Sequence, residues 1–155
     1  MKTPFRLLSV LALSALFSIG CASFVPATPP QFVELPDGKE YDYRAASADG
    51  LVLAVRVIDN EPVGSLAFWS EVIERRLRDT DGYALLEKKD VSTVKGEAGS
   101  QLRFGRDVGG APHLYNVTIF VTKKRIFLLE AGGSKPDMER YAATVDWSVR
   151  NFRIK

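Results

Sequence analysis

The strongest constraint on the fold is a pair of strand-like segments joined by a very short polar link. In residues 114–122, apolar side chains alternate with mainly polar ones, which predicts a strand with two different faces. Residues 125–130 contain four consecutive apolar side chains and predict a second strand. Only Lys123 and Lys124 lie between them, and parallel strands would need a crossover of about a dozen residues. We therefore expect an antiparallel sheet.

Two helices are expected beside this sheet. Apolar residues recur at helical spacing after Ser65, a favoured N-cap residue, and Gly82 gives a stop signal. A second helix is expected to start at Ser134 or Lys135, with Ser134 and Asp137 resembling a capping box. The two expected apolar stripes are Leu66, Trp69, Ile73 and Leu77, and then Met138, Tyr141, Val145, Val149 and Phe152.

The remaining strands complete an α+β domain. We expect them at residues 41–45, 51–57, 83–89 and 100–106, where apolar side chains alternate with polar ones between turn signals. The predicted order is β-β-α-β-β-β-β-α, with Gly132 and Gly133 ending the last strand. Because each helix must bury its apolar stripe, we predict an antiparallel sheet of about six strands flanked by two helices over residues 39–155.

This order resembles the PsbP-like superfamily. The resemblance covers about residues 41–154 and rests on the element order, on residues 117–121 and 127–133, and on the strand-Gly-Gly-Ser-helix ending. The superfamily includes photosystem II extrinsic proteins, a Ran-binding nuclear import factor and DcrB-type bacterial lipoproteins. The resemblance implies an α/β/α sandwich and an accessory or binding role without catalysis, although a fold does not fix a function.

The N-terminus has the layout of a secretory signal peptide. Lys2 and Arg6 precede an apolar run at residues 7–19, which is too short to span a bilayer comfortably. Residues 18–21 resemble the lipobox of bacterial lipoproteins, although Leu is usual where this chain has Ser18. The resemblance implies cleavage between Gly20 and Cys21 and attachment of a diacylglyceryl group to Cys21.

Cys21 is the only cysteine, so an internal disulfide is impossible and lipidation explains its presence. The alternative is an ordinary cysteine at the end of an uncleaved anchor. Residues 1–20 are thus predicted to be a signal peptide. By resemblance to lipoprotein sorting, the absence of Asp after Cys21 favours the outer membrane, with the protein facing the periplasm and carrying palmitate or a similar acyl chain.

Four prolines between residues 21 and 38 predict an extended tether between the lipid and the domain. A first strand near residues 31–35 is the alternative. The chain has 21 basic and 19 acidic residues, and two of the basic ones lie in the predicted signal peptide. The mature protein would therefore be neutral, which gives little support to nucleic-acid binding.

No catalytic or metal-binding constellation stands out. His113 is the only histidine, and it falls in a Gly- and Pro-rich stretch predicted to be a loop, without a Gly-x-Ser-x-Gly motif elsewhere. We expect no cofactor and no metal. Trp147 lies off the apolar stripe of the last helix, so Trp147 and His113 are candidates for a surface that binds a partner.

These observations predict a lipid-anchored, non-enzymatic accessory domain of the bacterial cell envelope that binds another envelope protein. The alternative is a lipoprotein that binds a small ligand or lipid, which requires a sizeable apolar pocket between sheet and helix. A hydrolase is the third possibility. A pocket that contains His113 and a nearby carboxylate would support it, whereas a His113 alone in solvent would count against it.

Overall fold

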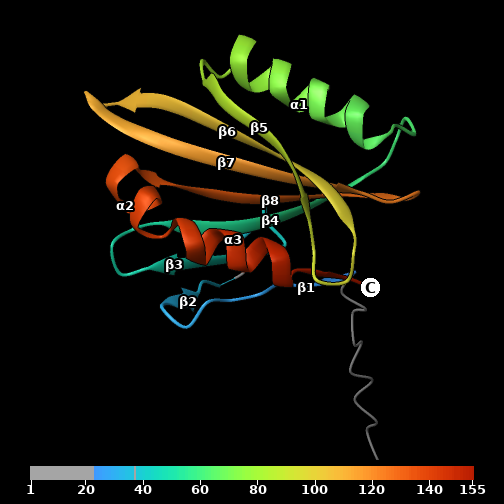
Figure 1. The fold of residues 1–155 in the computed structure, drawn as a ribbon, viewed down its shortest axis with the longest axis horizontal. Coiled ribbons are helices and arrows are strands. Elements are labelled where there is room, and N and C mark those ends of the chain that lie inside the picture. The colour runs from blue at the N-terminus through green and yellow to red at the C-terminus, as the bar shows by residue number, and fades with distance from the viewer. Residues whose placement is uncertain (1–22, 37) are drawn as a thin grey trace, which may run out of the picture.

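The computed structural model describes residues 23–36 and 38–155, so the predicted signal peptide, Gly20 and Cys21 lie outside the described part. The centre of the fold is a seven-stranded antiparallel sheet (Figure 1). Its strands are β2 (Phe32–Glu34), β3 (Tyr43–Ser47), β4 (Val52–Asp59), β5 (Ala84–Ser92), β6 (Ala98–Val108), β7 (Ala111–Val121) and β8 (Arg125–Ser134).

The strand order in the sheet is β2-β3-β4-β8-β7-β6-β5. Strands β5 to β8 form the expected meander, and the short link after β7 is a tight turn in which the Thr122 amide donates to the Arg125 carbonyl at 2.8 Å. Strand β8 then pairs with β4 over eight residues. This pairing joins the N-terminal hairpin to the meander, and the α+β sheet predicted from the sequence is confirmed with one additional strand, β2.

Helix α1 (Leu66–Asp79) packs on one face of the sheet, over β5, β6 and β7. The Ser65 hydroxyl accepts from the Phe68 amide, as expected of an N-cap, and Gly82 takes a positive φ after the helix. Buried Asn60 fixes the start of α1, because its side chain accepts from Trp69 Nε1 at 2.7 Å and donates to the Thr122 carbonyl at 2.8 Å.

The opposite face carries two short helices where one was expected. Helix α2 (Lys135–Arg140) is followed directly by α3 (Ala142–Asn151), and Tyr141 between them is the cap residue of both. The Ser134 hydroxyl caps α2 by accepting from the Asp137 amide. The predicted apolar stripe is buried at Met138, Val145, Val149 and Phe152 despite the break.

Residues 24–35 pack against the domain and differ from the extended tether that we expected. Strand β1 (Phe24–Val25) pairs with β9 (Arg153–Ile154), and β2 adds to the edge of the main sheet beside β3. Phe24 and Phe32 are both buried, and this gain of apolar burial explains why the segment does not run free. The alternative prediction, a first strand near residues 31–35, matches β2.

The glycines at the end of β8 do not end the strand, as we had predicted. Gly132 lies opposite Tyr115, and a Cβ at Gly132 would be 3.4 Å from the Tyr115 ring. A Cβ at Gly133 would be 3.4 Å from the Leu51 backbone. Neither glycine interrupts the pairing with β7, and the ladder continues to Ser134.

Candidate functional site

Helix α1 leaves part of its own sheet face uncovered. It lies over β5 to β7, whereas β4 and β8 continue beyond its edge. The α1 groove is the open depression between this edge and β4, with a volume of about 670 Å³. Volumes of this size are usual for ligand and peptide sites. The lining residues are Arg56, Ile58, Trp69, Val72, Ile73, Arg76, Leu77, Thr80, Asp81, Tyr83, Arg106, Tyr115, Val117 and Leu128.

One end of the α1 groove is apolar and accessible. Val72 of α1 and Ile58 of β4 line the groove and are 39% and 40% exposed, and Phe68, one helical turn before Val72, is 47% exposed. Side chains four residues apart lie on the same face of a helix, so Phe68 and Val72 are neighbours. The apolar wall of the groove therefore extends to the surface near the start of α1.

Three guanidinium groups line the same groove, from three different elements. Arg56 comes from β4, Arg76 from α1 and Arg106 from β6. Among the described residues, Arg76 makes no ion pair, and Arg106 donates to the Asp81 backbone carbonyl at 3.2 Å. Both keep donors that a bound acidic group could use.

The centre of this face is a network around the Glu130 carboxylate of β8. Glu130 accepts from Arg56 Nε at 2.6 Å and from the Tyr115 hydroxyl at 2.6 Å. Burial alone lowers the pKa of the Arg56 guanidinium, but attraction to Glu130 outweighs burial and raises that pKa. Burial, together with the Glu130 charge, raises the pKa of Tyr115 above its ordinary range. The Tyr115 hydroxyl therefore stays protonated at physiological pH and donates its hydrogen bond to Glu130.

Arginine–aromatic contacts extend this network on both sides. Arg106 lies over the Tyr83 ring at 4.6 Å, and the Tyr83 and Tyr115 rings are 5.4 Å apart. On the other side, two guanidinium groups lie over the Tyr41 ring. That of Arg56 is 5.2 Å from the ring centroid and that of Arg44 is 6.0 Å from it. We call this set the arginine–tyrosine row. Its members, in spatial order, are Arg106, Tyr83, Tyr115, Glu130, Arg56, Tyr41 and Arg44.

The row crosses the sheet from β6 to β3, that is, over five neighbouring strands. At about 4.8 Å per strand spacing, this is roughly 19 Å. The row carries three arginines and one carboxylate, so the face is positively charged apart from nearby Asp81. A surface of this length suits an extended partner better than a compact small molecule.

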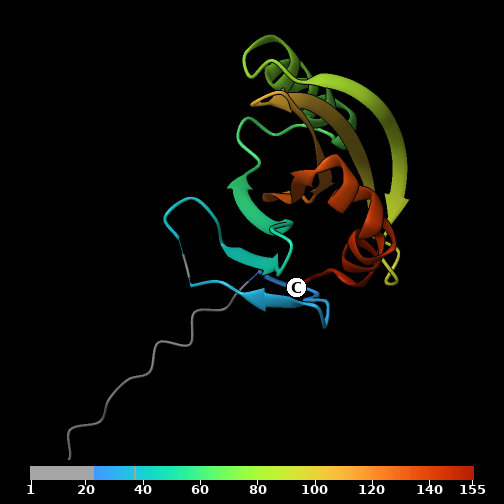
Figure 2. The same cartoon turned by 90° about the vertical axis from the view of Figure 1, so that its left-hand side faces the viewer.

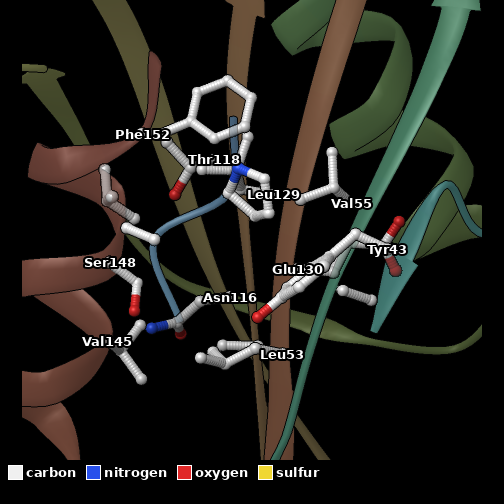
Figure 3. Close-up of a pocket in the computed structure, with 15 residues that line it drawn as sticks. Tyr43, Leu53, Val55, Asn116, Thr118, Leu129, Glu130, Val145, Ser148 and Phe152 are labelled. Carbon is white, nitrogen blue, oxygen red and sulfur yellow. The ribbon is translucent and has the colours of Figure 1, made fainter. Parts of the chain in front are cut away.

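A small, largely apolar cavity lies on the other face of the sheet. It lies between the sheet and α3, and residues 26–27 of the N-terminal segment close part of it (Figure 3). Its volume is about 30 Å³, which is room for one or two water molecules and not for a lipid. Asn116 Oδ1 and Ser148 Oγ face it without a hydrogen-bond partner in the described protein. Among the described residues, this cavity between the sheet and α3 is therefore too small to be the sizeable apolar pocket that ligand binding requires.

The structure places His113 and Trp147 on different elements. His113 belongs to β7 and is not in the predicted loop, because the Gly-rich stretch forms the turn between β6 and β7. Its Nδ1 is 3.1 Å from the Ala111 carbonyl. Trp147 lies on α3 and is 45% exposed. No cavity of the described residues is lined by both, and their role in partner binding stays a prediction.

His113 lines an open depression that also contains carboxylates, among them Glu87 and Asp107. No serine, threonine or cysteine lines it. Ser134, which pairs with His113 across the strands, uses its hydroxyl to cap α2. The depression therefore joins His113 to carboxylates, as the hydrolase alternative required, but the hydroxyl next to His113 in the sheet is taken up in capping a helix. Within residues 23–36 and 38–155, no group of three or more potential metal ligands occurs.

The domain is an α+β sandwich with α1 on one sheet face and α2 and α3 on the other (Figure 2). No family model matches the sequence, and no curated protein matches it either. The fold is nevertheless shared with several solved structures.

LpqN, which is involved in cell envelope biogenesis of Mycobacterium tuberculosis, superposes with a TM-score of 0.68 at 11% identity, over 85% of this chain and 83% of LpqN. Cyanobacterial PsbP from Synechocystis superposes with a TM-score of 0.58 at 12% identity, over 92% of this chain and 99% of PsbP. The Ran-binding protein Mog1p of Saccharomyces cerevisiae gives 0.58 at 10% identity, over 85% and 90%. At these identities the likeness concerns the fold alone.

In the part of the chain that the structure describes, no helix combines the length and apolarity needed to cross a membrane.

The arginine–tyrosine row was not predicted from the sequence. Its members are spread over residues 41–115 and Glu130, and no local motif links them. Only the pairing of β8 with both β4 and β7 brings Glu130 between Arg56 and Tyr115. The one available signal was Glu130 itself, a charged residue at the end of an otherwise apolar strand, since buried carboxylates usually have partners.

Proposed function

We propose that this chain is a non-enzymatic accessory domain of the bacterial cell envelope that binds another protein through the α1 groove and the arginine–tyrosine row. The observation that supports this role is the combination on one face of exposed apolar side chains with a row of arginines and tyrosines. Tyrosine and arginine are enriched at the energetic centres of protein interfaces, where they combine apolar contact area with directed hydrogen bonds.

The partner that fits this surface is a segment with acidic and apolar side chains. Arg76 and Arg106 offer donors to carboxylates, whereas Val72 and Ile58 offer apolar contacts at the other end of the groove. A length of roughly 19 Å corresponds to about six residues of extended chain. The protein-binding and envelope roles of Mog1p and LpqN are consistent with this proposal at the level of the shared fold.

The domain is held at the membrane, in this proposal, by a lipid on Cys21 after cleavage behind Gly20. Because Cys21 is the chain's only cysteine, lipidation can be read directly from intact mass and from labelling with palmitate. Cys21→Ala should abolish labelling. Ser18→Leu, which restores the usual lipobox residue, should keep it. Labelling that survives in Cys21→Ala would contradict the anchor.

Photo-crosslinking can test the docking surface. A photoreactive amino acid replaces Arg76, which lines the groove, or Arg75, its neighbour on the same helix, which does not line it and pairs with Glu71. We expect a crosslink to an envelope protein from position 76 and not from position 75, and mass spectrometry should map it to an acidic, apolar segment. Adding Arg106→Glu should remove the crosslink. Equal crosslinking from both positions would contradict a specific site.

A second candidate is binding of an anionic amphiphile, since the α1 groove lies between sheet and helix and has a volume of about 670 Å³. Extraction of the purified protein with organic solvent, followed by mass spectrometry, distinguishes the two. A stoichiometric acyl compound that is lost in Val72→Asp would favour the amphiphile. A protein free of such a compound that still crosslinks from position 76 would favour the protein partner.

A further inference from the structure

The two ends of the described chain meet at one end of the domain. Strand β1 pairs with β9, and the Lys155 amide donates to the Ser23 carbonyl at 2.9 Å. The turn between β5 and β6 joins them, because the Val94 amide donates to the Arg150 carbonyl at 2.7 Å. In Figure 1 this turn and the C-terminus lie together, on the side of the molecule away from α1.

This end carries four exposed cations. Lys95 comes from the turn, Arg150 from the end of α3, and Arg153 and Lys155 from the C-terminal segment. None of them makes an ion pair among the described residues. Val94, at the tip of the turn, is 62% exposed. We call these five residues the basic end.

Two carboxylates lie near these cations. Asp146 pairs with Lys89 at 3.7 Å, whereas Glu97 accepts from the Thr93 hydroxyl and keeps its negative charge. Compensation of the α3 dipole accounts for a cation at Arg150, but not for Lys95, which lies in another element. The basic end therefore keeps an excess of positive charge.

The distance to the proposed anchor is short. Phe24 is fixed in β1, and it is only three residues from Cys21, which is about 11 Å of chain at full extension. A lipid on Cys21 would thus keep the basic end within about one Debye length of the bilayer surface. A cation that reaches the headgroups favours the bound state by about a fivefold factor, and the factor falls off within a Debye length.

We propose that the basic end docks on anionic phospholipid headgroups, with Val94 at the level of the headgroups, so that the domain lies on the bilayer in one orientation. This inference rests on the proposed lipid anchor. It goes further, because an anchor alone would leave the domain free to rotate over the surface. The orientation would turn α1 and its groove away from the membrane.

The acylated full chain can test this in vesicles of phosphatidylcholine, with or without phosphatidylglycerol. Since the thiol of Cys21 is blocked by the lipid, Val94→Cys gives one labelling site for an environment-sensitive fluorophore. Lys123→Cys, on the turn between β7 and β8, is the matched control. Spin-labelled lipid should quench the fluorophore at position 94 at least twice as strongly in vesicles with phosphatidylglycerol as in vesicles without it. At position 123 the quenching should be the same in both.

Charge reversal distinguishes the basic end from a general charge effect. Arg153→Glu with Lys155→Glu should remove the increase, as should 0.5 M salt. Lys123→Glu with Lys124→Glu changes the net charge equally and should leave the increase intact. Circular dichroism checks that the variants fold. Equal quenching in both vesicle types would contradict the docking of the basic end. A protein that fails to bind even neutral vesicles would instead contradict the lipid anchor.

Discussion

Glu130 holds the middle of the arginine–tyrosine row, because it accepts hydrogen bonds from residues of two neighbouring strands. Glu130→Ala should lower the free energy of unfolding by about 2 kcal/mol, since Arg56 loses its partner but retains access to solvent. Asp59→Ala, which removes the exposed pair with Arg125, should cost less than about 1 kcal/mol. Urea unfolding measures both. Similar losses in the two variants would mean that the network around Glu130 is not more stabilising than a surface pair.

Tyr115 should give the stability of the domain a dependence on alkaline pH. Its pKa is raised in the folded protein above the ordinary value of 10.0, so the folded state keeps a proton that the unfolded state releases. The stabilisation is therefore complete below about pH 10 and is lost as the pH rises further. Between pH 8 and pH 11, the free energy of unfolding should therefore fall less for Tyr115→Phe than for wild type. An unchanged difference between the two pH values would contradict the raised pKa.

Residues that act locally were predictable, whereas residues that act through the sheet were not. Ser65 and Ser134 cap helices as expected, because an N-cap needs only an amide three residues away. Gly132 and Gly133 were misread as a strand end, because pairing with β7 on one side and β4 on the other keeps the strand extended through both glycines. Contacts of this kind depend on strand order, and sequence periodicity does not encode it.

Strand β1 is the element that most changes the interpretation of the N-terminal segment. Phe24 stacks on Phe152 at 5.5 Å and contacts Phe127 edge-on at 6.3 Å. Phe24→Ala should therefore lower the free energy of unfolding by about 3 kcal/mol. Val33→Ala, in the neighbouring strand but 71% exposed, should change it by less than about 0.5 kcal/mol. An unchanged free energy of unfolding in Phe24→Ala would instead support the extended tether.

The same element shows why the segment was read as a tether. Its prolines do not oppose packing here, because the strands that it forms are very short and pair at edges, where few amides are needed. Conversely, helix α1 and the meander from β5 to β8 were predictable, since their periodicity extends over whole elements. Long amphipathic patterns survive tertiary packing, whereas two- and three-residue strands leave almost no pattern to find.

At the scale of the whole molecule, the termini and α1 lie on different sides in both views (Figures 1 and 2). In the proposed anchoring, a short connection to a lipid on Cys21 would place the basic end at the bilayer and would present the α1 groove to partners in the surrounding compartment. Neither arrangement was visible in the sequence, because Lys95 and Lys155 are sixty residues apart and meet only through the pairing of Ser23 and Val94 with the C-terminal segment.

The length of this connection can be changed without altering the fold. Twenty Gly and Ser residues inserted after Ala22 would have a mean span of about 25 Å, well beyond the Debye length. Lipidation and the free energy of unfolding should stay the same, because β1 is untouched. Quenching at position 94 should fall, since the effective concentration of the basic end at the surface decreases with linker length. Crosslinking from Arg76 should persist. Unchanged quenching would show that the basic end binds the bilayer tightly without help from the short connection.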